Sequence, residues 1–463
     1  MSNVVEVVVT SEGSGQLWNA CVWDPRVGSP LMTYRGGGVA APHSLCLLGK
    51  DYLIISDHTK PVLHAWQLNS QQPVLAKGVR LVCPGCVTSV AVSPDGCYCV
   101  TAVAEKLHVW QIASGRHLAV AVRHFQSISC VRFTDDGSHF VSGGEDGLVL
   151  VWSLAYLVSN NAGEMISGQN EPRHVFADHS LPVRDLYVGP GGMRARLISV
   201  SMDRTCKLYD LASGNLLLSV VYDCLLSAVT MDTTEIEVFV GGSDSNIYQF
   251  GLHSPPRMQE YHLSKEEKSK KFAGHTKAVT CLSASVDGVT LLSGSLDSEV
   301  MLWHIPSRQC MKVLHHKGPV TNAFFTLAPK CIFSEEMKPT LVLRSFQKSS
   351  DLNEEGTVAV SIQMTQDKWY GVDDYYYYDS KSDHMAVTSS TTEDSGLKEQ
   401  IISLKKINSD LYGFALEKIL QPFSSNQTED VKSNRSNSTQ PAASKSLMKA
   451  QKLKKKKSKK LNN

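Results

Sequence analysis

The fold of this chain is decided by the segment GHTKAVTCLSASVDGVTLLSGSLDSEVMLWHIPS, Gly274 to Ser307. It holds two runs of alternating apolar and polar residues separated by an Asp-Gly turn, then Ser-Leu-Asp, then an apolar run that ends at Trp303. Such alternation between turns predicts neighbouring antiparallel strands. A sheet built from one such unit leaves apolar faces that only another copy could cover. The segment therefore predicts a repeat protein, provided that the unit recurs.

The unit does recur along the chain. An aromatic residue ends an apolar run at seven places, at intervals of 43, 44, 42, 57, 41 and 53 residues. Four of these intervals match the ~40–45 residues expected of four strands and their turns. The two long intervals contain polar insertions, 159–172 and 253–271, which we expect to be exposed loops. The aromatic residues are Trp23, Trp66, Trp110, Trp152, Tyr209, Phe250 and Trp303.

Three of the units also share a set of polar residues at fixed spacing. A His opens the unit, an Asp lies six residues before the terminal aromatic residue, and a Ser lies four residues before that Asp. An indole N–H needs an acceptor when it is buried, and Ser, His and Asp can relay the hydrogen bond. The three sets are His124, Ser142, Asp146 and Trp152; His179, Ser199, Asp203 and Tyr209; and His275, Ser293, Asp297 and Trp303.

This combination of a Gly-His start, a Ser-x-x-x-Asp element and a strand that ends in Trp resembles the WD40 repeat family. The resemblance implies an all-β fold, a seven-bladed β-propeller in which each blade is a four-stranded sheet. It also implies that the shared His, Ser, Asp and Trp form hydrogen-bonded sets within the blades. Two units depart from the pattern, because the Asp position before Trp110 is blurred and Phe250 cannot donate a hydrogen bond.

Closure of the ring requires one blade that is shared between the two ends of the propeller. The first run, VEVVVTSEGSGQLWNACVWD, has the pattern of the later strands of a blade. We expect the missing strands to come from VTNAFFTLAP, Val320 to Pro329, and TLVLRSFQ, Thr340 to Gln347. Pairing of both ends in one sheet would remove exposed edges. The propeller is therefore predicted to span residues 1–365.

The composition changes after the propeller. Residues 366–395 form an acidic, Tyr-rich and then Ser/Thr-rich linker, whose loop 370–379 should face solvent or bind a partner. Residues 396–421 show the spacing of one coiled-coil seam, and Asn408 is typical of a polar residue that sets the register of two strands. So short a helix needs a partner, which could be a second copy, another protein or the propeller itself. The seam residues are Leu397, Ile401, Leu404, Asn408 and Leu411.

Charge is unevenly distributed. The formal net charge is +1, but residues 445–460 hold nine Lys and no acidic residue, which leaves 37 Lys and Arg against 45 Asp and Glu elsewhere. Region 422–463 is predicted to be a disordered tail. Its Lys cluster is either a solvated charge run or a nuclear or nucleolar address that also binds RNA phosphates, and the acidic body favours the second reading. The cluster comprises Lys452, Lys454, Lys455, Lys456, Lys457, Lys459 and Lys460.

Several classes of protein are disfavoured. No stretch has the pattern of a signal peptide, and the apolar runs are far shorter than the ~18 residues of a membrane span, so we expect a soluble intracellular protein with reduced cysteines. Cys83, Cys86, Cys97 and Cys99 could hold zinc. However, a second Cys-x-x-Cys is missing, and Cys97 and Cys99 should both point into the packing of a blade.

Enzymatic activity is also disfavoured. Ser, His and Asp recur together in unit after unit, whereas a catalytic set would occur once. The chain has no phosphate-binding loop of the Walker type. We therefore expect no catalytic residue, no cofactor and no metal, and we expect a loss of stability when a residue such as His275 or Asp297 is replaced.

Nearly the whole chain resembles one WD40 family, that of WD repeat-containing protein 18. The similarity lies in VVVTSEGSGQLWNACVWDPRVGSPLMTYRGG, FVSGGEDGLVLVWSL and SDLYGFALEKILQ. It implies a non-catalytic scaffold of a nucleolar complex that matures the 60S ribosomal subunit and processes the internal spacer of pre-rRNA. The implied partners are a Pro/Glu/Leu-rich scaffold protein, a helical-repeat protein, a midasin-type AAA ATPase, the pre-60S particle and a second copy bound through the C-terminal helix.

The implied localisation is the nucleolus and nucleoplasm, with a cytoplasmic pool left open. Other functions remain alternatives because propellers host many of them. One is a substrate receptor of a ubiquitin ligase, and another is a nuclear scaffold in chromatin or DNA replication. The sequence leaves open which face of the propeller would bind which partner.

Overall fold

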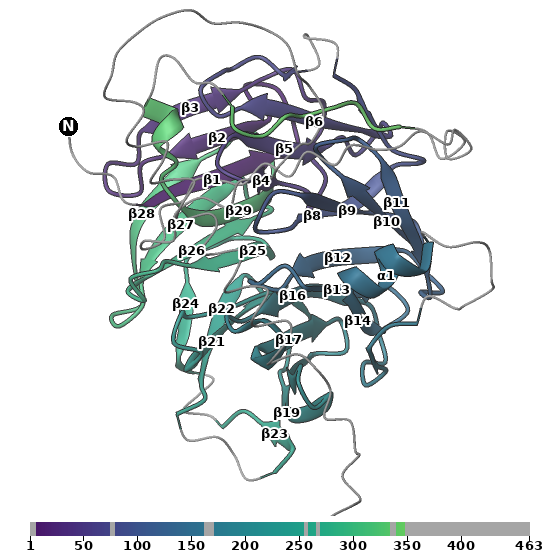
Figure 1. Ribbon diagram of the computed structural model, residues 1–463. Coiled ribbons are helices and arrows are strands. Elements are labelled where there is room, and N and C mark those ends of the chain that lie inside the picture. Colours follow the sequence, from purple (N-terminus) through teal and green to yellow (C-terminus); the bar gives the residue numbers. More distant parts are fainter. Residues whose placement is uncertain are drawn as a thin grey trace, which may run out of the picture. The chain divides into compact units, whose positions relative to one another are not determined.

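The computed structural model describes residues 6–74, 79–161, 171–253, 258–264, 269–333 and 339–347. These residues form seven separate sheets, each with four or five strands, arranged in a ring (Figure 1). The prediction of a seven-bladed β-propeller is thus confirmed. We number the blades 1 to 7 along the ring, starting with the sheet that contains the first strand. No helix in the described ranges is long and apolar enough to cross a membrane.

From the centre outward, the strands of the first three blades are as follows. Blade 1 contains β29 (Val320–Leu327), β1 (Glu6–Glu12), β2 (Ala20–Trp23) and β3 (Pro30–Tyr34). Blade 2 contains β4 (Cys46–Leu48), β5 (Tyr52–Ser56), β6 (Val62–Gln67) and β7 (Leu81–Val82). Blade 3 contains β8 (Val87–Val92), β9 (Tyr98–Val103), β10 (Lys106–Gln111) and β11 (His117–Val122).

The other four blades follow the same order. Blade 4 contains β12 (Ile128–Phe133), β13 (His139–Gly144), β14 (Val149–Ser153) and β15 (His174–Phe176). Blade 5 contains β16 (Val183–Val188), β17 (Arg196–Ser201), β18 (Thr205–Asp210), β19 (Asn215–Val221) and β23 (Glu260–His262). Blade 6 contains β20 (Leu226–Met231), β21 (Glu237–Gly242), β22 (Asn246–Gly251) and β24 (Lys271–Ala273). Blade 7 contains β25 (Val279–Ala284), β26 (Thr290–Ser295), β27 (Glu299–His304) and β28 (Gln309–His315).

The seven aromatic residues that marked the repeat occupy equivalent places. Each lies on the third strand from the centre of its blade: β2, β6, β10, β14, β18, β22 or β27. All seven side chains are buried, and Trp66, Trp152, Tyr209 and Trp303 are among the largest fully buried side chains. An aromatic residue at this position fills the space between neighbouring blades, which is why the spacing of these residues reports the architecture.

Blade 1 is built from both ends of the described chain. Strand β29 pairs with β1 in antiparallel register, from Glu6 opposite Leu327 to Glu12 opposite Val320. The prediction that the run at 320–329 completes this blade is therefore confirmed. One strand is sufficient for closure, because β1, β2 and β3 already supply the other three.

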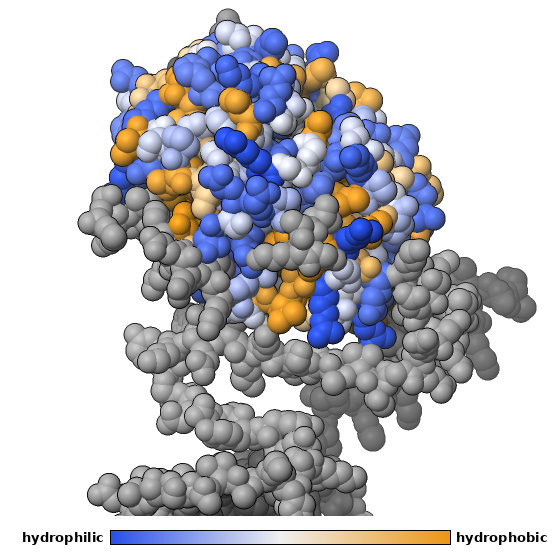
Figure 2. All heavy atoms as spheres, turned by 90° about the horizontal axis from the view of Figure 1, so that it is seen from above, coloured by the Kyte–Doolittle hydropathy of each residue, from blue (hydrophilic) through white to orange (hydrophobic). Residues whose placement is uncertain are grey.

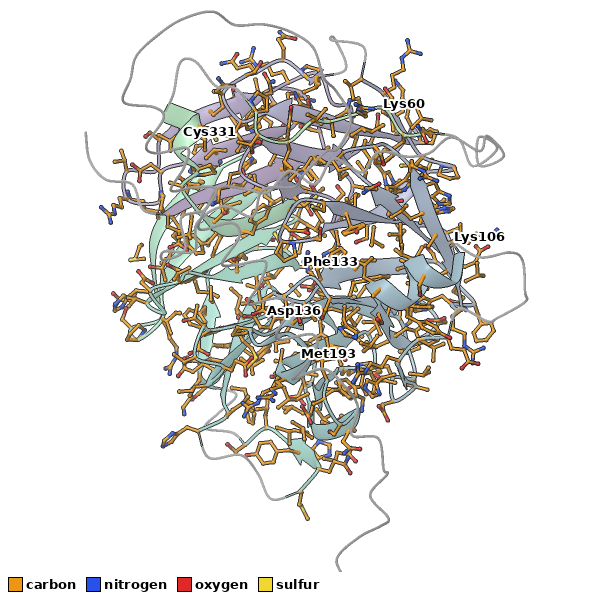
Figure 3. The ribbon with its side chains drawn as sticks, in the orientation of Figure 1. Lys60, Lys106, Phe133, Asp136, Met193 and Cys331 are labelled. Atoms are coloured by element: carbon orange, nitrogen blue, oxygen red, sulfur yellow. The ribbon has the colours of Figure 1, made fainter. Side chains whose placement is uncertain are left out.

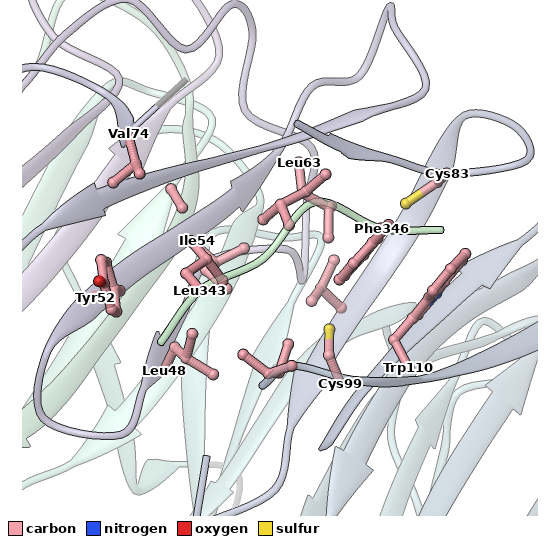
Figure 4. Close-up of a cluster of buried hydrophobic side chains, with 14 of the residues drawn as sticks. Leu48, Tyr52, Ile54, Leu63, Val74, Cys83, Cys99, Trp110, Leu343 and Phe346 are labelled. Atoms are coloured by element: carbon pink, nitrogen blue, oxygen red, sulfur yellow. The ribbon is translucent and has the colours of Figure 1, made fainter. Parts of the chain in front are cut away.

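The prediction that Thr340 to Gln347 also belongs to this blade is wrong. These residues form no strand and instead run along blades 2 and 3, where Leu343 and Phe346 are buried against Leu48 and Trp110 (Figure 4). We call residues 339–347 the strap. The apolar residues that suggested a strand, Leu343 and Phe346, are buried between blades 2 and 3.

Polar contacts hold both ends of the strap. The Oδ2 atom of Asp51, in the turn before β5, accepts hydrogen bonds from the backbone N–H groups of Thr340 and Leu341 at 2.7 and 2.8 Å. At the other end, the N–H of Phe346 donates to the carbonyl of Arg80 at 3.0 Å, and the N–H of Gln347 donates to that of Gly115 at 2.8 Å. The strap therefore crosses from blade 2 to blade 3.

The two insertions are more ordered than the sequence suggested. Part of the insertion at 253–271 forms β23, which pairs in parallel with β19 as a fifth strand of blade 5. The carbonyl of Gln259 accepts a hydrogen bond from the N–H of Ser219 at 2.7 Å, and Leu263 is buried. The insertion at 159–172 begins within helix α1 (Leu154–Asn161), which contacts β11. These parts are therefore a strand and the end of a helix and not loops, whereas the expected exposure is confirmed at Ser159, Met258, Glu260 and His262.

The predicted linker 366–395, helix 396–421 and tail 422–463 lie outside the described residues. Seen from above blades 1 and 2, the described surface is mainly hydrophilic with separate apolar patches (Figure 2). Scattered apolar side chains of this kind are normal on a folded domain, so only a patch with further features can indicate a binding site.

Candidate functional site

The predicted polar residues of blade 7 meet in one hydrogen-bonded chain. Trp303 Nε1 donates to Ser293 Oγ at 2.8 Å, Ser293 Oγ lies 2.7 Å from His275 Nε2, and His275 Nδ1 lies 2.9 Å from Asp297 Oδ2. An ionised carboxylate can only accept, so His275 Nδ1 donates to Asp297, and Nε2 of a singly protonated ring accepts from the Ser293 hydroxyl, whose oxygen accepts the indole N–H. The set links the loop before β25 to strands β26 and β27.

This connectivity equals that of a Ser-His-Asp catalytic triad, but its surroundings do not suit catalysis. Ser293 and the side chain of His275 are fully buried, and Trp303 already occupies the Ser oxygen. The carboxylate of Asp297 also accepts the backbone N–H groups of Thr276 and Glu299 at 3.0 Å each. A substrate could reach the Ser oxygen only if the blade opened, so we assign the set to blade structure.

The same chain of contacts occurs in blade 4, and its His-Ser-Asp part occurs in blade 5, where the buried Tyr209 hydroxyl has no hydrogen-bond partner among the described residues. In blade 4, His124 lies 2.8 Å from Ser142 Oγ and 3.1 Å from Asp146 Oδ2, and Trp152 donates to Ser142 at 2.9 Å. In blade 5 the corresponding distances are 2.7 Å for His179 to Ser199 and 2.8 Å for His179 to Asp203, with Tyr209 in the place of Trp.

Electrostatics support this structural role. Burial raises the pKa of the Asp297 carboxyl, but hydrogen bonds from the Thr276 N–H and from His275 outweigh this effect, so the pKa lies below its usual value. In blade 5, His179 and Thr205 likewise outweigh burial and hold the pKa of Asp203 well below its usual range. Both carboxylates therefore stay ionised as hydrogen-bond acceptors at neutral pH.

Blade 1 contains a related but incomplete set, because neither ring nitrogen of its His316 has a hydrogen-bond partner in the part of the chain that the structure describes. Trp23 Nε1 donates to Thr10 Oγ1 at 2.8 Å, and Glu12 Oε2 accepts the N–H of Lys317 at 2.9 Å and lies 3.8 Å from Nδ1 of the buried His316. Thr and Glu thus replace Ser and Asp, and the His comes from the other end of the propeller. The His-Lys-Gly-Pro turn before β29 was the only local signal for this set.

Blade 3 contains a further substitution in its set. Trp110 Nε1 donates to Thr101 Oγ1 at 3.1 Å. Cys83 lies four residues before β8, as His275 lies four before β25, and it is buried in the same apolar cluster as Trp110. Burial raises the pKa of the Cys83 thiol to about 12. Cys83 therefore stands in the His position as a protonated thiol.

The four cysteines of the zinc alternative do not converge on one site. Cys99 is buried in the same cluster, whereas Cys86 and Cys97 are exposed. The expectation that Cys97 and Cys99 point the same way is wrong, because Cys97 precedes β9 and belongs to the turn. Within the described ranges, no three His, Cys, Asp or Glu residues are placed to hold a metal ion.

Charged side chains meet at the centre of the ring. The Asp185 carboxylate on β16 lies 3.5 Å from Arg132 Nη2 and 3.6 Å from His43 Nδ1, and it accepts the N–H of Val229 at 3.1 Å. Burial lowers the pKa of His43 and outweighs the attraction of Asp185. These residues border a hollow of about 240 Å³ between five innermost strands. They join blades 4, 5 and 6 to the loop before β4.

A second hollow, of about 540 Å³, lies beside it between the ends of the innermost strands β8, β12 and β16. Its wall includes Pro94, Phe133, Tyr187 and Val188, and Phe133 lies near the middle of the ring while Lys60 and Lys106 lie near its periphery (Figure 3). A mainly apolar wall of this kind can accept a side chain of a bound protein. This second hollow, between β8, β12 and β16, is thus a candidate protein-interaction site.

Comparison with known proteins agrees with the fold. Residues 115–153, 170–210 and 266–304 match the family model described as WD domain, G-beta repeat. The chain is 38% identical to WD repeat-containing protein 18 of Mus musculus over 437 residues, which cover 91% of this chain and 100% of the mouse protein. Identity to the human protein of that name is also 38%, over 442 residues, with the same coverage. The chain belongs to the WD repeat-containing protein 18 family.

The blades of this chain differ in how closely their polar sets follow the His, Ser, Asp and Trp pattern. The three segments that match the repeat model contain the complete sets of blades 4 and 7 and the His-Ser-Asp part of the set in blade 5. Blades 1 and 3 use Thr10, Glu12, Cys83 and Thr101 instead. A more distant relative is the Pre-rRNA-processing protein pro-1 of Caenorhabditis briggsae, 24% identical over 410 residues, which cover 86% of this chain and 74% of pro-1. WD40 propellers are usually interaction scaffolds, in keeping with the buried state of the Ser-His-Asp sets.

Proposed function

We propose that this chain is a non-catalytic scaffold in the processing of pre-rRNA during maturation of the large ribosomal subunit. The observation that supports this most directly is its similarity, over most of its length, to the WD repeat-containing protein 18 family and to a protein named for pre-rRNA processing. The geometry is compatible with this role, because the residues of the polar sets hydrogen-bond to one another inside the blades and the outer surfaces can bind partners.

Depletion and rescue test this function. Loss of the protein should increase the pre-rRNA species that retain the internal spacer, as measured by northern hybridisation, and the wild-type chain should restore the normal pattern. A chain with Ser29→Ala, an exposed position, serves as the matched control for expression and rescue. Unchanged spacer-containing species after depletion would refute the proposal, and co-purification with a cullin adaptor in place of pre-rRNA would support the ubiquitin-ligase alternative.

The proposed complex is nucleolar and holds a Pro/Glu/Leu-rich scaffold protein, a helical-repeat protein and a midasin-type AAA ATPase on the pre-60S particle. This assignment rests on the family resemblance. Affinity purification of the full chain with identification of proteins and RNA at several salt concentrations tests it. Recovery of these partners together with pre-60S rRNA is expected, and their absence at low salt would contradict the assignment.

The Lys-rich tail is proposed to be both the nucleolar address and an RNA-phosphate arm. Deletion of 444–463 should lower nucleolar accumulation and reduce the salt sensitivity of RNA recovery, because phosphate contacts release counterions. Deletion of the equally long segment 424–443 is the control, since it removes a Ser- and Asn-rich stretch instead. Equal nucleolar signals for both deletions would exclude the address.

A further inference from the structure

A hollow of about 550 Å³ lies at the seam where blade 7 meets blade 1. Its wall is mainly apolar and includes Leu302 of β27, Met311 of β28, Phe325 and Leu327 of β29, and Val286 of the turn before β26. Three of these side chains are open to solvent, with exposed fractions of 60% for Val286, 49% for Met311 and 61% for Leu327. Three such residues around one hollow form a patch and not a random scatter.

The outermost strand of blade 7 borders this hollow, and its outer edge pairs with no strand among the residues that the structure describes. Outer strands β7, β15 and β24 have only two or three residues, β3 starts with Pro30, and β11 is contacted by α1. The seven-residue β19 is covered by β23. Strand β28 also has seven residues, yet β27 is its only pairing partner in the described part of the chain. Its outer backbone N–H and C=O groups can pair with another strand.

Blade 5 shows how such an edge is used in this protein. There β23 adds to β19 in parallel, the Gln259 carbonyl receives the Ser219 N–H, and Leu263 enters the apolar cluster of blades 5 and 6. An added strand thus combines backbone pairing with the burial of a large side chain. The β28 edge offers the same combination, with the seam hollow beside Met311.

Charges of both signs line the hollow, and the two cations lie together at one place. Its acidic residues are engaged within the fold: Glu6 accepts the Ser285 hydroxyl and the Val286 N–H, and the Asp287 carboxylate accepts the N–H of Val289. On the opposite side, the exposed Arg26 lies next to Lys312, whose Nζ contacts the Arg26 carbonyl. Two adjacent cations at the rim would attract a carboxylate.

We propose that the seam between blades 7 and 1 binds an extended segment of another protein, added as a fifth strand on β28. The segment places a large apolar side chain into the hollow beside Met311 and Leu327, and a carboxylate next to Arg26. The mainly apolar wall favours protein over RNA as the ligand. The inference rests on the seam alone and does not depend on a role in pre-rRNA processing.

Photo-crosslinking in cells identifies the occupant. Met311→p-benzoylphenylalanine is introduced into the full chain, and the crosslinked peptide is sequenced by mass spectrometry. The same replacement at Val175, 47% exposed on β15, is the matched control. The proposal expects a peptide from another protein that has a large apolar residue near Asp or Glu. Crosslinks to residues 348–463 of this chain or to a second copy would overturn it. A crosslinking yield at Met311 no higher than that at Val175 would also overturn it.

The captured sequence is then synthesised and its binding to the purified full chain is measured by fluorescence anisotropy. Met311→Asp and Leu327→Asp should each weaken binding at least tenfold, and Val175→Asp should leave it unchanged. Hydrogen exchange at residues 309–315 should slow on binding, because added strand pairing protects the amides. Equal affinity for the Met311 and Val175 variants, or no protection of β28, would overturn the proposal. Thermal unfolding of each variant checks that all of them are folded.

Discussion

Phe346 lies parallel to Trp110, with ring centroids 4.4 Å apart and an interplanar angle of 2°. Trp110 is one of the residues that mark the repeat, whereas Phe346 follows the last blade strand by many residues (Figure 4). Trp110 also lies close to two His rings, His117 at a centroid distance of 4.5 Å and His108 at 6.5 Å. The stack therefore fixes the strap against blade 3.

Removal of the strap's aromatic ring should destabilise the propeller. Phe346→Ala deletes a nearly buried side chain and its stack on Trp110, and we expect a cost of about 3 kcal/mol in the free energy of unfolding, the lower end of the range for buried Phe. Urea denaturation of the full chain measures this change. Arg344→Ala, at an exposed position of the same strap, should change stability by no more than about 0.5 kcal/mol. Equal effects of the two variants would contradict the role of the stack.

Loss of the hydroxyl at the centre of a polar set should also lower the free energy of unfolding. Ser293→Ala leaves the buried Trp303 Nε1 and His275 Nε2 without their shared partner, which should cost about 1–3 kcal/mol. Thermal and urea unfolding measure the cost, with Ser29→Ala as the exposed control. A variant that loses a hydrolytic activity while keeping wild-type stability would instead support a catalytic set.

Acid should destabilise the protein through a buried His pair on the outer half of blade 3. Burial, together with the charges of His117 and Lys106, lowers the pKa of His108 from 6.5 to about 4. Between these two values the unfolded chain binds more protons than the folded one, so stability is complete above about pH 6.5 and decreases as the pH falls toward 4. In His108→Asn this loss should be shallower. Parallel pH profiles of urea unfolding for both proteins would contradict the prediction.

The cysteines should react according to their position in blade 3 and not as a metal cluster. In the native protein, iodoacetamide should label Cys86 first, Cys97 slowly, and the buried Cys83 and Cys99 only after unfolding. Burial and the nearby Asp95 raise the pKa of Cys97 to about 11, which leaves little thiolate at neutral pH. Mass spectrometry of timed samples measures the order. Protection of all four thiols that disappears with a chelator would indicate zinc instead.

The predicted coiled-coil seam should control the oligomeric state. Replacing Ile401, Leu404 and Leu411 by Asp puts charges at seam positions and should convert a dimer into a monomer, as measured by light scattering. Replacement of Lys405, Lys406 and Glu417 by Ala, outside the seam, is the matched control and should leave the mass unchanged. A monomeric wild-type chain, or a dimeric Asp variant, would refute dimerisation through this helix.

The repeat itself could be read from the sequence because its signals are local. These signals are the spacing of the buried aromatic residues, the Asp-Gly turns and the Ser-x-x-x-Asp element. The turns and the Ser-x-x-x-Asp element lie within one blade, and the aromatic spacing repeats from one blade to the next. The run at Val320 to Pro329 was also predictable as the closing strand, since an incomplete first blade needs one more strand. The Ser-Asp sets of blades 4, 5 and 7 followed from the same short-range pattern.

Only the tertiary structure placed the remaining parts, because their partners are distant in the sequence or chemically substituted. The strap has the alternation of a strand, but Leu343 and Phe346 gain more by burial between blades 2 and 3. Strand β23 pairs with β19 although it belongs to an insertion of blade 6. The set of blade 1 combines Thr10 with His316, two residues that only closure of the ring brings together. Short-range pattern thus determined the blades and the closing strand by itself. Contacts between blades, which depend on packing in three dimensions, decided where the strap, the added strand β23 and the polar set of blade 1 lie.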